Sequence, residues 1–335
     1  MKKFAMAISV VLLMVFAAPV SAEPVVLKYA QFEPNNNVFA MKDIWLPWVE
    51  KMNKEGEGLF KIEVYVGGTL NRVPPKQLKI LRDGVADIAF ILPSYTPGIF
   101  ADDSVVEVPF VAETALEAGI ASHMMLQKGL LKNYDIIVPL MLSAGQQYAI
   151  HSTFPVKTPG DLKGKKIRAT GKMQHYMAQA FGAAPIGMPV TKIAESMSRG
   201  LIQGTTNEWN AVRTFKIDDI AKYHCMLPLG TVTFLLAMNK DKFNSLPKKA
   251  QDIFMNNREY TMRLWAEKMD ADLDKHYEKV KADPKHHVYI PTDAETMEWQ
   301  KVLAPAVESW MKDDPKRKGL LESYKEEVAK ARAGK

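Results

Sequence analysis

The chain has 335 residues, of which 47% are hydrophobic, so it can bury one or two ordinary cores. Its formal net charge of +6 is mild, and its sequence lacks the clustered basic and aromatic residues of a nucleic-acid groove, so we expect no nucleic-acid partner. The single cysteine, Cys225, excludes an internal disulfide, so the packed core must stabilise the fold.

Residues 1–22 have the features of a secretory signal peptide. Lys2 and Lys3 precede an apolar run from Phe4 to Ala18, and Val20-Ser21-Ala22 is a small-residue cleavage pattern. A membrane anchor is the alternative, but this run is short for a span of about 20 residues. We therefore expect cleavage after Ala22 and a periplasmic protein.

Strands and helices alternate along the first half of the chain. The hydrophobic periodicity predicts strands at residues 26–32, 61–66, 87–92 and 136–142, and helices at residues 38–54, 74–83 and 114–128. Pro47 lies inside the first helix and should bend it or end its first half. This alternation predicts an α/β architecture with largely parallel strand pairing.

The second half repeats the plan before a helical end. Strands are expected at residues 147–150, 165–169, 184–188, 202–206 and 231–238, and helices at residues 173–181, 191–199, 247–281 (one helix or two) and 294–333, with a break near Pro315. Two similar units in tandem suggest two lobes, although one large sheet is an alternative.

We place lobe I at residues 23–148 with part of 232–270, and lobe II at residues 149–231 with part of 270–325. Residues 326–335 are expected to be a flexible tail.

The sequence contains little that could transform a substrate. It has no G-x-S-x-G elbow, H-E-x-x-H helix or phosphate-binding P-loop, and no pair of histidines has metal-ligand spacing. Cys225 lies beside His224, but adjacent residues rarely present their side chains to each other, so we expect a packed thiol. We therefore expect no enzymatic activity, no cofactor and no metal.

Arg168 is the polar residue that the strand pattern singles out. It lies near the end of the strand at residues 165–169, where an open α/β sheet presents groups to a ligand. Its guanidinium can hold a carboxylate with two parallel hydrogen bonds. The alternative is that Arg168 is one surface arginine among many.

Short motifs then point to one family, because their order and spacing are specific although each alone is weak. They are Gly67-Gly68-Thr69-Leu70, Leu81-x-Asp83-Gly84-x-x-Asp87-Ile88, Pro97-Gly98-x-Phe100, Val108-Pro109-Phe110, Asp161-Leu-Lys-Gly-x-Lys-Ile-Arg168, Gly200-Leu-Ile-Gln-Gly204, Met238-Asn239-Lys240 and Leu246-Pro247. From Leu27 to about Tyr324, the chain resembles the DctP-type periplasmic solute-binding proteins of TRAP transporters.

The resemblance implies two α/β lobes, joined by crossing strands and a long connecting helix, that close on an organic acid like a flytrap. It places Arg168 on the arginine that grips the ligand carboxylate. Gln146 stands where some members have a second arginine, which argues against a second carboxylate there. Asn207 stands at a polar ligand-contacting position, and we expect Trp209 to form a flat apolar wall.

Four further residues are expected near the ligand. Phe39, Tyr95 and Arg72 lie on lobe I loops that should face the cleft, and Phe234 is another available aromatic side chain; ordinary loop or core roles are the alternative. We expect a monocarboxylate, and an aromatic, hydrophobic, 2-oxo or 2-hydroxy acid rather than a dicarboxylate or sugar acid. We expect it to be delivered to the membrane subunits of a TRAP transporter. A ligand-sensing adaptor for a membrane sensor, or an exported enzyme on the same fold, are the alternatives.

Overall fold

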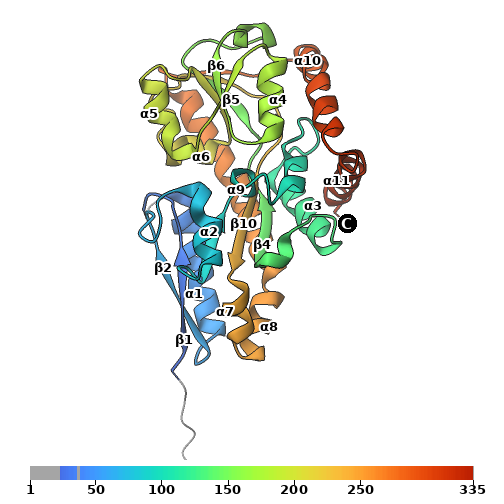
Figure 1. Ribbon diagram of the computed structural model, residues 1–335. Helices are drawn as coiled ribbons and strands as arrows, with labels where there is room; N and C mark the ends of the chain where they lie inside the picture. The colour runs from blue at the N-terminus through green and yellow to red at the C-terminus, as the bar shows by residue number, and fades with distance from the viewer. Residues whose placement is uncertain (1–22, 36–37, 335) are drawn as a thin grey trace, which may run out of the picture.

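The computed structural model describes residues 23–35 and 38–334. The expected signal peptide lies outside these residues. Within them, no helix is both long enough and apolar enough to cross a membrane. Figure 1 shows two lobes stacked end to end, with long helices running beside and between them.

Lobe I is built on a five-stranded sheet with the order β2-β1-β3-β10-β4. Its strands are β1 (Val25–Ala30), β2 (Phe60–Tyr65), β3 (Ile88–Ile91), β4 (Val138–Ala144) and β10 (Thr233–Met238). Its helices are α1 (Leu46–Glu55), α2 (Gln77–Arg82), α3 (Ala115–Gln127), α7 (Lys240–Ser245) and α8 (Lys248–Asn256). Strand β1 is parallel to β2 and β3, but β10 is antiparallel to both its neighbours. The sheet is therefore mixed, because the chain returns to lobe I after building lobe II.

Lobe II contains a six-stranded sheet with the order β11-β9-β5-β8-β6-β7. Its strands are β5 (Ala149–Ser152), β6 (Lys166–Ala169), β7 (Ala184–Gly187), β8 (Gly204–Asn207), β9 (Tyr223–Cys225) and β11 (His287–Tyr289). Its helices are α4 (Lys172–Ala180), α5 (Ile193–Ser198) and α6 (Trp209–Thr214). Strand β5 is antiparallel to β8 and β9, whereas β6 is parallel to β7 and β8.

Three long helices complete the molecule: α9 (Arg258–Ala282), α10 (Asp293–Lys312) and α11 (Arg317–Arg332). Helix α9 packs on α3 and β4 of lobe I and on α6 and β11 of lobe II, so it joins the lobes. Helix α10 packs on α4, whereas α11 returns to lobe I and packs on α3 (Figure 1).

Two details differ from the sequence-based expectations. Residues 326–332 belong to α11, within the helical stretch expected at residues 294–333, rather than to the expected flexible tail, because Val328 is buried and Arg332 pairs with Glu117. The expected helix at residues 38–54 contains a π-helical turn, Met41–Trp45, directly before α1. Pro47 is near the start of α1 and has no N–H to donate, so the helical hydrogen-bond pattern changes there.

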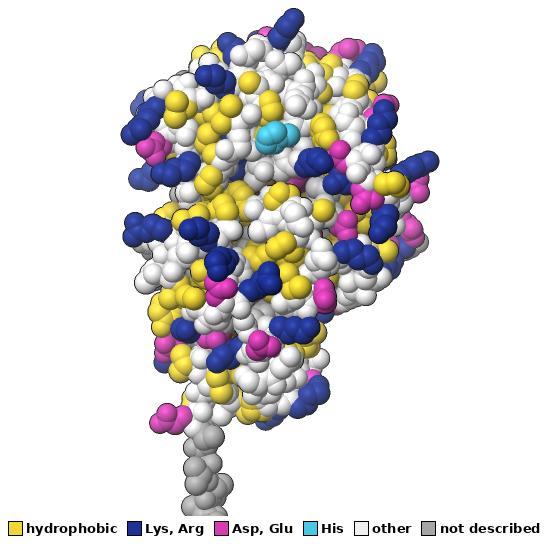
Figure 2. Space-filling model, viewed as in Figure 1, with side chains coloured by type: hydrophobic (Ala, Val, Ile, Leu, Met, Phe, Trp, Pro, Cys, Tyr) yellow, Lys and Arg dark blue, Asp and Glu magenta, His cyan; other side chains and the backbone are white. Residues whose placement is uncertain are grey.

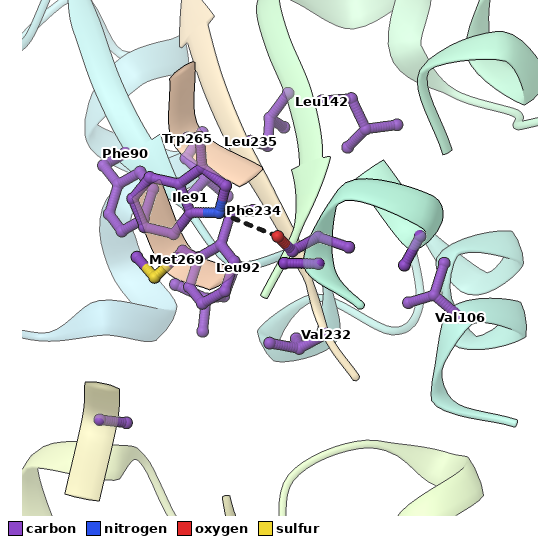
Figure 3. Close-up of a cluster of buried hydrophobic side chains, with 14 of the residues drawn as sticks. Phe90, Ile91, Leu92, Val106, Leu142, Val232, Phe234, Leu235, Trp265 and Met269 are labelled. Atoms are coloured by element: carbon purple, nitrogen blue, oxygen red, sulfur yellow. Dashed lines mark hydrogen bonds between the residues drawn. The ribbon is translucent and has the colours of Figure 1, made fainter. Parts of the chain in front are cut away.

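The core of lobe I continues to the boundary between the lobes. Figure 3 shows Phe90 of β3, Phe234 of β10 and Trp265 of α9 packed together. The indole N–H of Trp265 donates to the carbonyl of Ala144 at 3.0 Å, which fixes α9 against the end of β4. On the face in Figure 2, charged side chains are dispersed, and hydrophobic side chains gather around the boundary between the lobes. The candidate pocket described below also lies between the lobes.

Candidate ligand-binding site

Arg168 is buried at the end of β6, with 2% of its surface exposed. Its Nε donates to the carbonyl of Met188 at 3.1 Å, Nη1 to Oδ1 of Asn207 at 3.3 Å, and Nη2 to the hydroxyl of Tyr95 at 3.4 Å. All three acceptors are neutral, and no carboxylate of the described residues forms an ion pair with it. The guanidinium is thus held in place while its charge stays available to an anion.

Asn207 and Tyr95 fix this arrangement from opposite lobes. Asn207 ends β8, and its Oδ1 also accepts from the hydroxyl of Thr205 at 2.6 Å. Tyr95 comes from lobe I, in the turn after β3, and its hydroxyl accepts from the backbone N–H of Val190 in lobe II at 2.9 Å. The lobes therefore touch across the cleft beside Arg168.

A narrow pocket lies between the lobes at this point. It has about 430 Å³ of space free of protein atoms, but the centre of a water molecule fits into only about 30 Å³ of it. Phe90 and Phe234 stack nearly parallel in its wall, with ring centroids 5.4 Å apart. The lining is Phe32, Glu33, Phe90, Leu92, Tyr95, Tyr148, Arg168, Thr170, Val190, Asn207, Glu208, Asn210, Ala211, Phe215, Phe234 and Trp265. A narrow slot with an aromatic wall and one buried cation suits a flat organic anion.

Two carboxyl groups share the pocket with Arg168. Glu33 and Glu208 are 4% and 5% exposed, and Oε2 of each has no hydrogen-bond partner. Burial, with the charge of Glu208, raises the pKa of Glu33 to about 8. Burial raises the pKa of Glu208 to about 7, although nearby Arg168 opposes the shift. Burial also raises the pKa of Glu107, near Arg168, to about 8. The site therefore favours protonated carboxyls.

Of the eight ligand-binding residues expected from the sequence, four line this pocket: Arg168, Asn207, Tyr95 and Phe234. The other four lie elsewhere. Arg72 is exposed on a lobe I loop, and its backbone packs close to Gly68. Phe39 lines a separate surface groove, where its ring packs on the guanidinium of Arg213 at 5.4 Å.

Gln146 is a buried bridge between two helices. Its Nε2 donates to the carbonyl of Met269 in α9 at 2.6 Å, and its Oε1 accepts from the backbone N–H of Asn210 in α6 at 3.0 Å. Both ends of the amide are engaged by the backbone. Its role in the structure is to hold α6 against α9, not to present a group to the pocket.

Trp209 lies in the interior of lobe II rather than at the pocket wall. Its ring packs against the imidazoles of His151, His224 and His276, with centroids 4.7, 4.8 and 5.6 Å away. The side chain points back into the lobe because Trp209 begins α6. The wall expected from Trp209 is formed by Phe90, Phe234 and Trp265 instead.

A chain of histidines runs from the cleft towards the surface of lobe II. Nε2 of His151 lies 3.1 Å from the carbonyl of Asn207, Nδ1 of His151 lies 2.8 Å from Nδ1 of His224, and Nε2 of His224 lies 2.9 Å from Nδ1 of His286. Lys222 lies 3.4 Å from the other nitrogen of His286. Lys222 can only donate, and the carbonyl of Asn207 can only accept. The hydrogen bonds therefore run in one direction, from Lys222 to Asn207, and each neutral imidazole donates to the next.

Sequence reasoning missed several pocket residues, chiefly Glu33, Tyr148, Glu208 and Trp265. A usable signal existed for the two acids, because Glu33 follows β1 and Glu208 follows β8, and strand ends carry ligand groups in open α/β sheets. Trp265 gave no such signal, because it is one apolar position on a long amphipathic helix.

Two α/β lobes that close over a pocket with a buried cation define a solute-binding receptor of the flytrap type. Residues 33–314 match the family called bacterial extracellular solute-binding protein, family 7, and the chain belongs to this family. This family and its structural neighbours are solute-binding receptors of the TRAP type, not enzymes, and the proteins bind small organic acids.

Two solved structures are similar to this chain over 92% of its length and 99% of theirs. One is a TRAP solute-binding protein from Rhodoferax ferrireducens T118 in complex with copurified benzoate, 27% identical with a TM-score of 0.86. The other is a marine metagenome TRAP protein specific for aromatic acids, bound to 3-hydroxybenzoate, 26% identical with a TM-score of 0.86. A solute-binding protein of Albidiferax ferrireducens is 26% identical over 267 residues, 75% of each chain.

Proposed function

We propose that this protein is a periplasmic receptor that binds an aromatic monocarboxylate through Arg168 and delivers it to the membrane subunits of a TRAP transporter. The observation that carries the proposal is the buried guanidinium of Arg168, held by three neutral acceptors and facing an aromatic slot. A carboxylate there gains two charge-assisted hydrogen bonds in a site that excludes water.

The ligands of two relatives support this class of acid. Benzoate and 3-hydroxybenzoate, found in those structures, are flat monocarboxylates. In this chain the stacked pair Phe90 and Phe234, with Trp265, provides a wall for such a ring. Arg168 is the only cation among the described residues that line the pocket. Gln146, which stands where some relatives have a second arginine, is occupied by backbone contacts.

We expect the membrane subunits to recognise the closed form of the receptor. A ligand between Arg168 of lobe II and the aromatic wall of lobe I contacts both lobes only when they meet, so binding shifts the population to the closed form. Export, with cleavage after Ala22, would place the protein in the periplasm.

Calorimetric titration of the mature protein with benzoate tests the clamp. We expect Arg168→Met to lose about 2–5 kcal/mol of binding free energy, because the carboxylate would be buried without its partner. Arg72→Met is the matched control, since Arg72 is exposed and outside the pocket. Equal affinity of wild type and Arg168→Met would refute the clamp. Loss of acid uptake on deletion of the gene tests delivery.

A further inference from the structure

Two carboxyl oxygens in the pocket lack a hydrogen-bond partner among the residues that the structure describes. Oε2 of Glu33 and Oε2 of Glu208 are buried, line the same pocket as Arg168, and have no hydrogen-bond partner. A buried acceptor without a partner costs free energy, so a polar atom from a ligand would be stabilised there. A plain benzoate has no donor to offer them.

The backbone of each acid has a structural role of its own. The carbonyl of Glu33 accepts from Gly67 and its N–H donates to Gln31, so its backbone holds the loop after β1. The carbonyl of Glu208 accepts from the N–H of Val212 and begins α6. The Glu208 carboxyl also interacts with the Asn207 side chain, but Oε2 of each acid is left without a partner at the pocket.

The two acids come from opposite sides of the cleft. Glu33 follows β1 in lobe I, and Glu208 follows β8 in lobe II, beside Asn207. The charge of Glu208, together with burial, disfavours ionisation of Glu33. A donor between them would give their free oxygens a partner, favour their ionised forms and join the lobes at a second point, away from the neutral contacts of Arg168.

We propose that Glu33 and Glu208 form a second recognition point, so that the ligand is an organic acid with both a carboxylate for Arg168 and a hydrogen-bond donor, hydroxyl or amine, for these acids. This inference rests on the proposed function and specifies its ligand class. The carboxylate supplies orientation, and the donor supplies selectivity against acids that lack it.

Matched ligands test the inference by calorimetry. The probes are benzoate, the three monohydroxybenzoates, the three monomethoxybenzoates as acceptors without a donor, and 3-(aminomethyl)benzoate as a cationic donor. We expect wild type to bind its best hydroxybenzoate about tenfold or more tightly than benzoate and the matching methoxy acid, as one hydrogen bond to a charged or buried acceptor allows. The aminomethyl probe separates a preference for a cation from a preference for a neutral donor.

The variants Glu33→Leu and Glu208→Leu should reduce this preference, measured as the ratio of the affinities for the hydroxybenzoate and for benzoate, to about twofold. Glu57→Leu, on an exposed turn, is the control and should keep the preference. Circular dichroism and urea unfolding check that each variant folds. If a variant does not fold, the test is the preference of the wild-type protein for a hydroxybenzoate over benzoate and over the matching methoxy acid.

Two failures can be told apart. If wild type binds benzoate but prefers no donor-bearing acid, or if both leucine variants retain the full preference, the second recognition point is refuted and the carboxylate receptor stands. If none of the acids binds, the proposed function fails and this inference fails with it.

Discussion

The hydroxyl of Tyr95 in lobe I and the backbone N–H of Val190 in lobe II form a hydrogen bond of 2.9 Å across the cleft. The same hydroxyl accepts from Arg168 at 3.4 Å. One oxygen atom thus connects the closing of the lobes with the position of the cation that we propose as the ligand clamp.

Replacing Tyr95 with Phe should favour the open form. The change leaves the N–H of Val190 without its partner and should cost closure about 0.5–1.5 kcal/mol, which lowers benzoate affinity roughly two- to tenfold. Titration calorimetry measures the affinity. Tyr289→Phe is the matched control, because that hydroxyl bonds to Glu295 within lobe II. Equal losses in both variants would contradict a role for the contact between the lobes.

Gln146 should matter for stability rather than for ligand choice. In Gln146→Leu, the carbonyl of Met269 and the N–H of Asn210 lose a buried partner, which should cost about 2–4 kcal/mol of unfolding free energy. Urea unfolding measures the loss. The preference among carboxylates should be unchanged, and a variant as stable as wild type would show that this bridge is dispensable.

Raising the pH should favour the open form of the ligand-free protein. Burial raises the pKa of Glu33 to about 8 and that of Glu208 to about 7, from 4.5, so the closed form binds more protons than the open form between about 4.5 and 8. Closure is thus favoured at the acid end of this window and is lost as the pH rises through the folded pKa values. Tyr95, Tyr148 and Arg168 surround these acids, and Glu107 adds to the effect in the same direction.

Small-angle scattering measures this change as a larger radius of gyration at pH 9 than at pH 6. The double variant Glu33→Gln and Glu208→Gln should show a smaller change, because only Glu107 of the three acids then titrates. Glu57→Gln should behave as wild type. A radius that is constant with pH in wild type would exclude this mechanism.

The histidine chain should make the protein sensitive to acid. Burial lowers the pKa of His151 to about 4 and, with neighbouring cations, that of His224 to about 2, from 6.5. The unfolded chain therefore binds more protons below pH 6.5, and stability falls as the pH drops towards these folded values. Each group removes up to about 1.4 kcal/mol per pH unit.

His224→Gln should reduce the slope of unfolding free energy against pH by about that amount between pH 6 and pH 4. Urea unfolding at several pH values gives the slope. His175→Gln, on α4, serves as the control because the ring of His175 is not part of the row of hydrogen-bonded histidines. A slope unchanged by His224→Gln would mean that other groups cause the acid loss.

The two-lobe α/β fold and the position of Arg168 could be predicted because both depend on local patterns and on motif order. Strands β9 and β11 could not, because three residues are too few to show a period. The orientation of the Trp209 side chain also could not be predicted from the sequence. It depends on where α6 begins and on three histidines that the fold gathers from β5, β9 and α9. Glu33 and Glu208 line one pocket only because two separate sheets bring their strand ends together.

The path of α9 has a mechanical consequence. This helix of 25 residues packs on β4 and α3 at one end and on α6 and β11 at the other, without an interruption. Lobe movement cannot occur by swinging about a loop alone, because α9 must bend or slide as the lobes turn. We therefore expect α9 to resist opening elastically. This limits how far the lobes separate and keeps their relative orientation for the next closure.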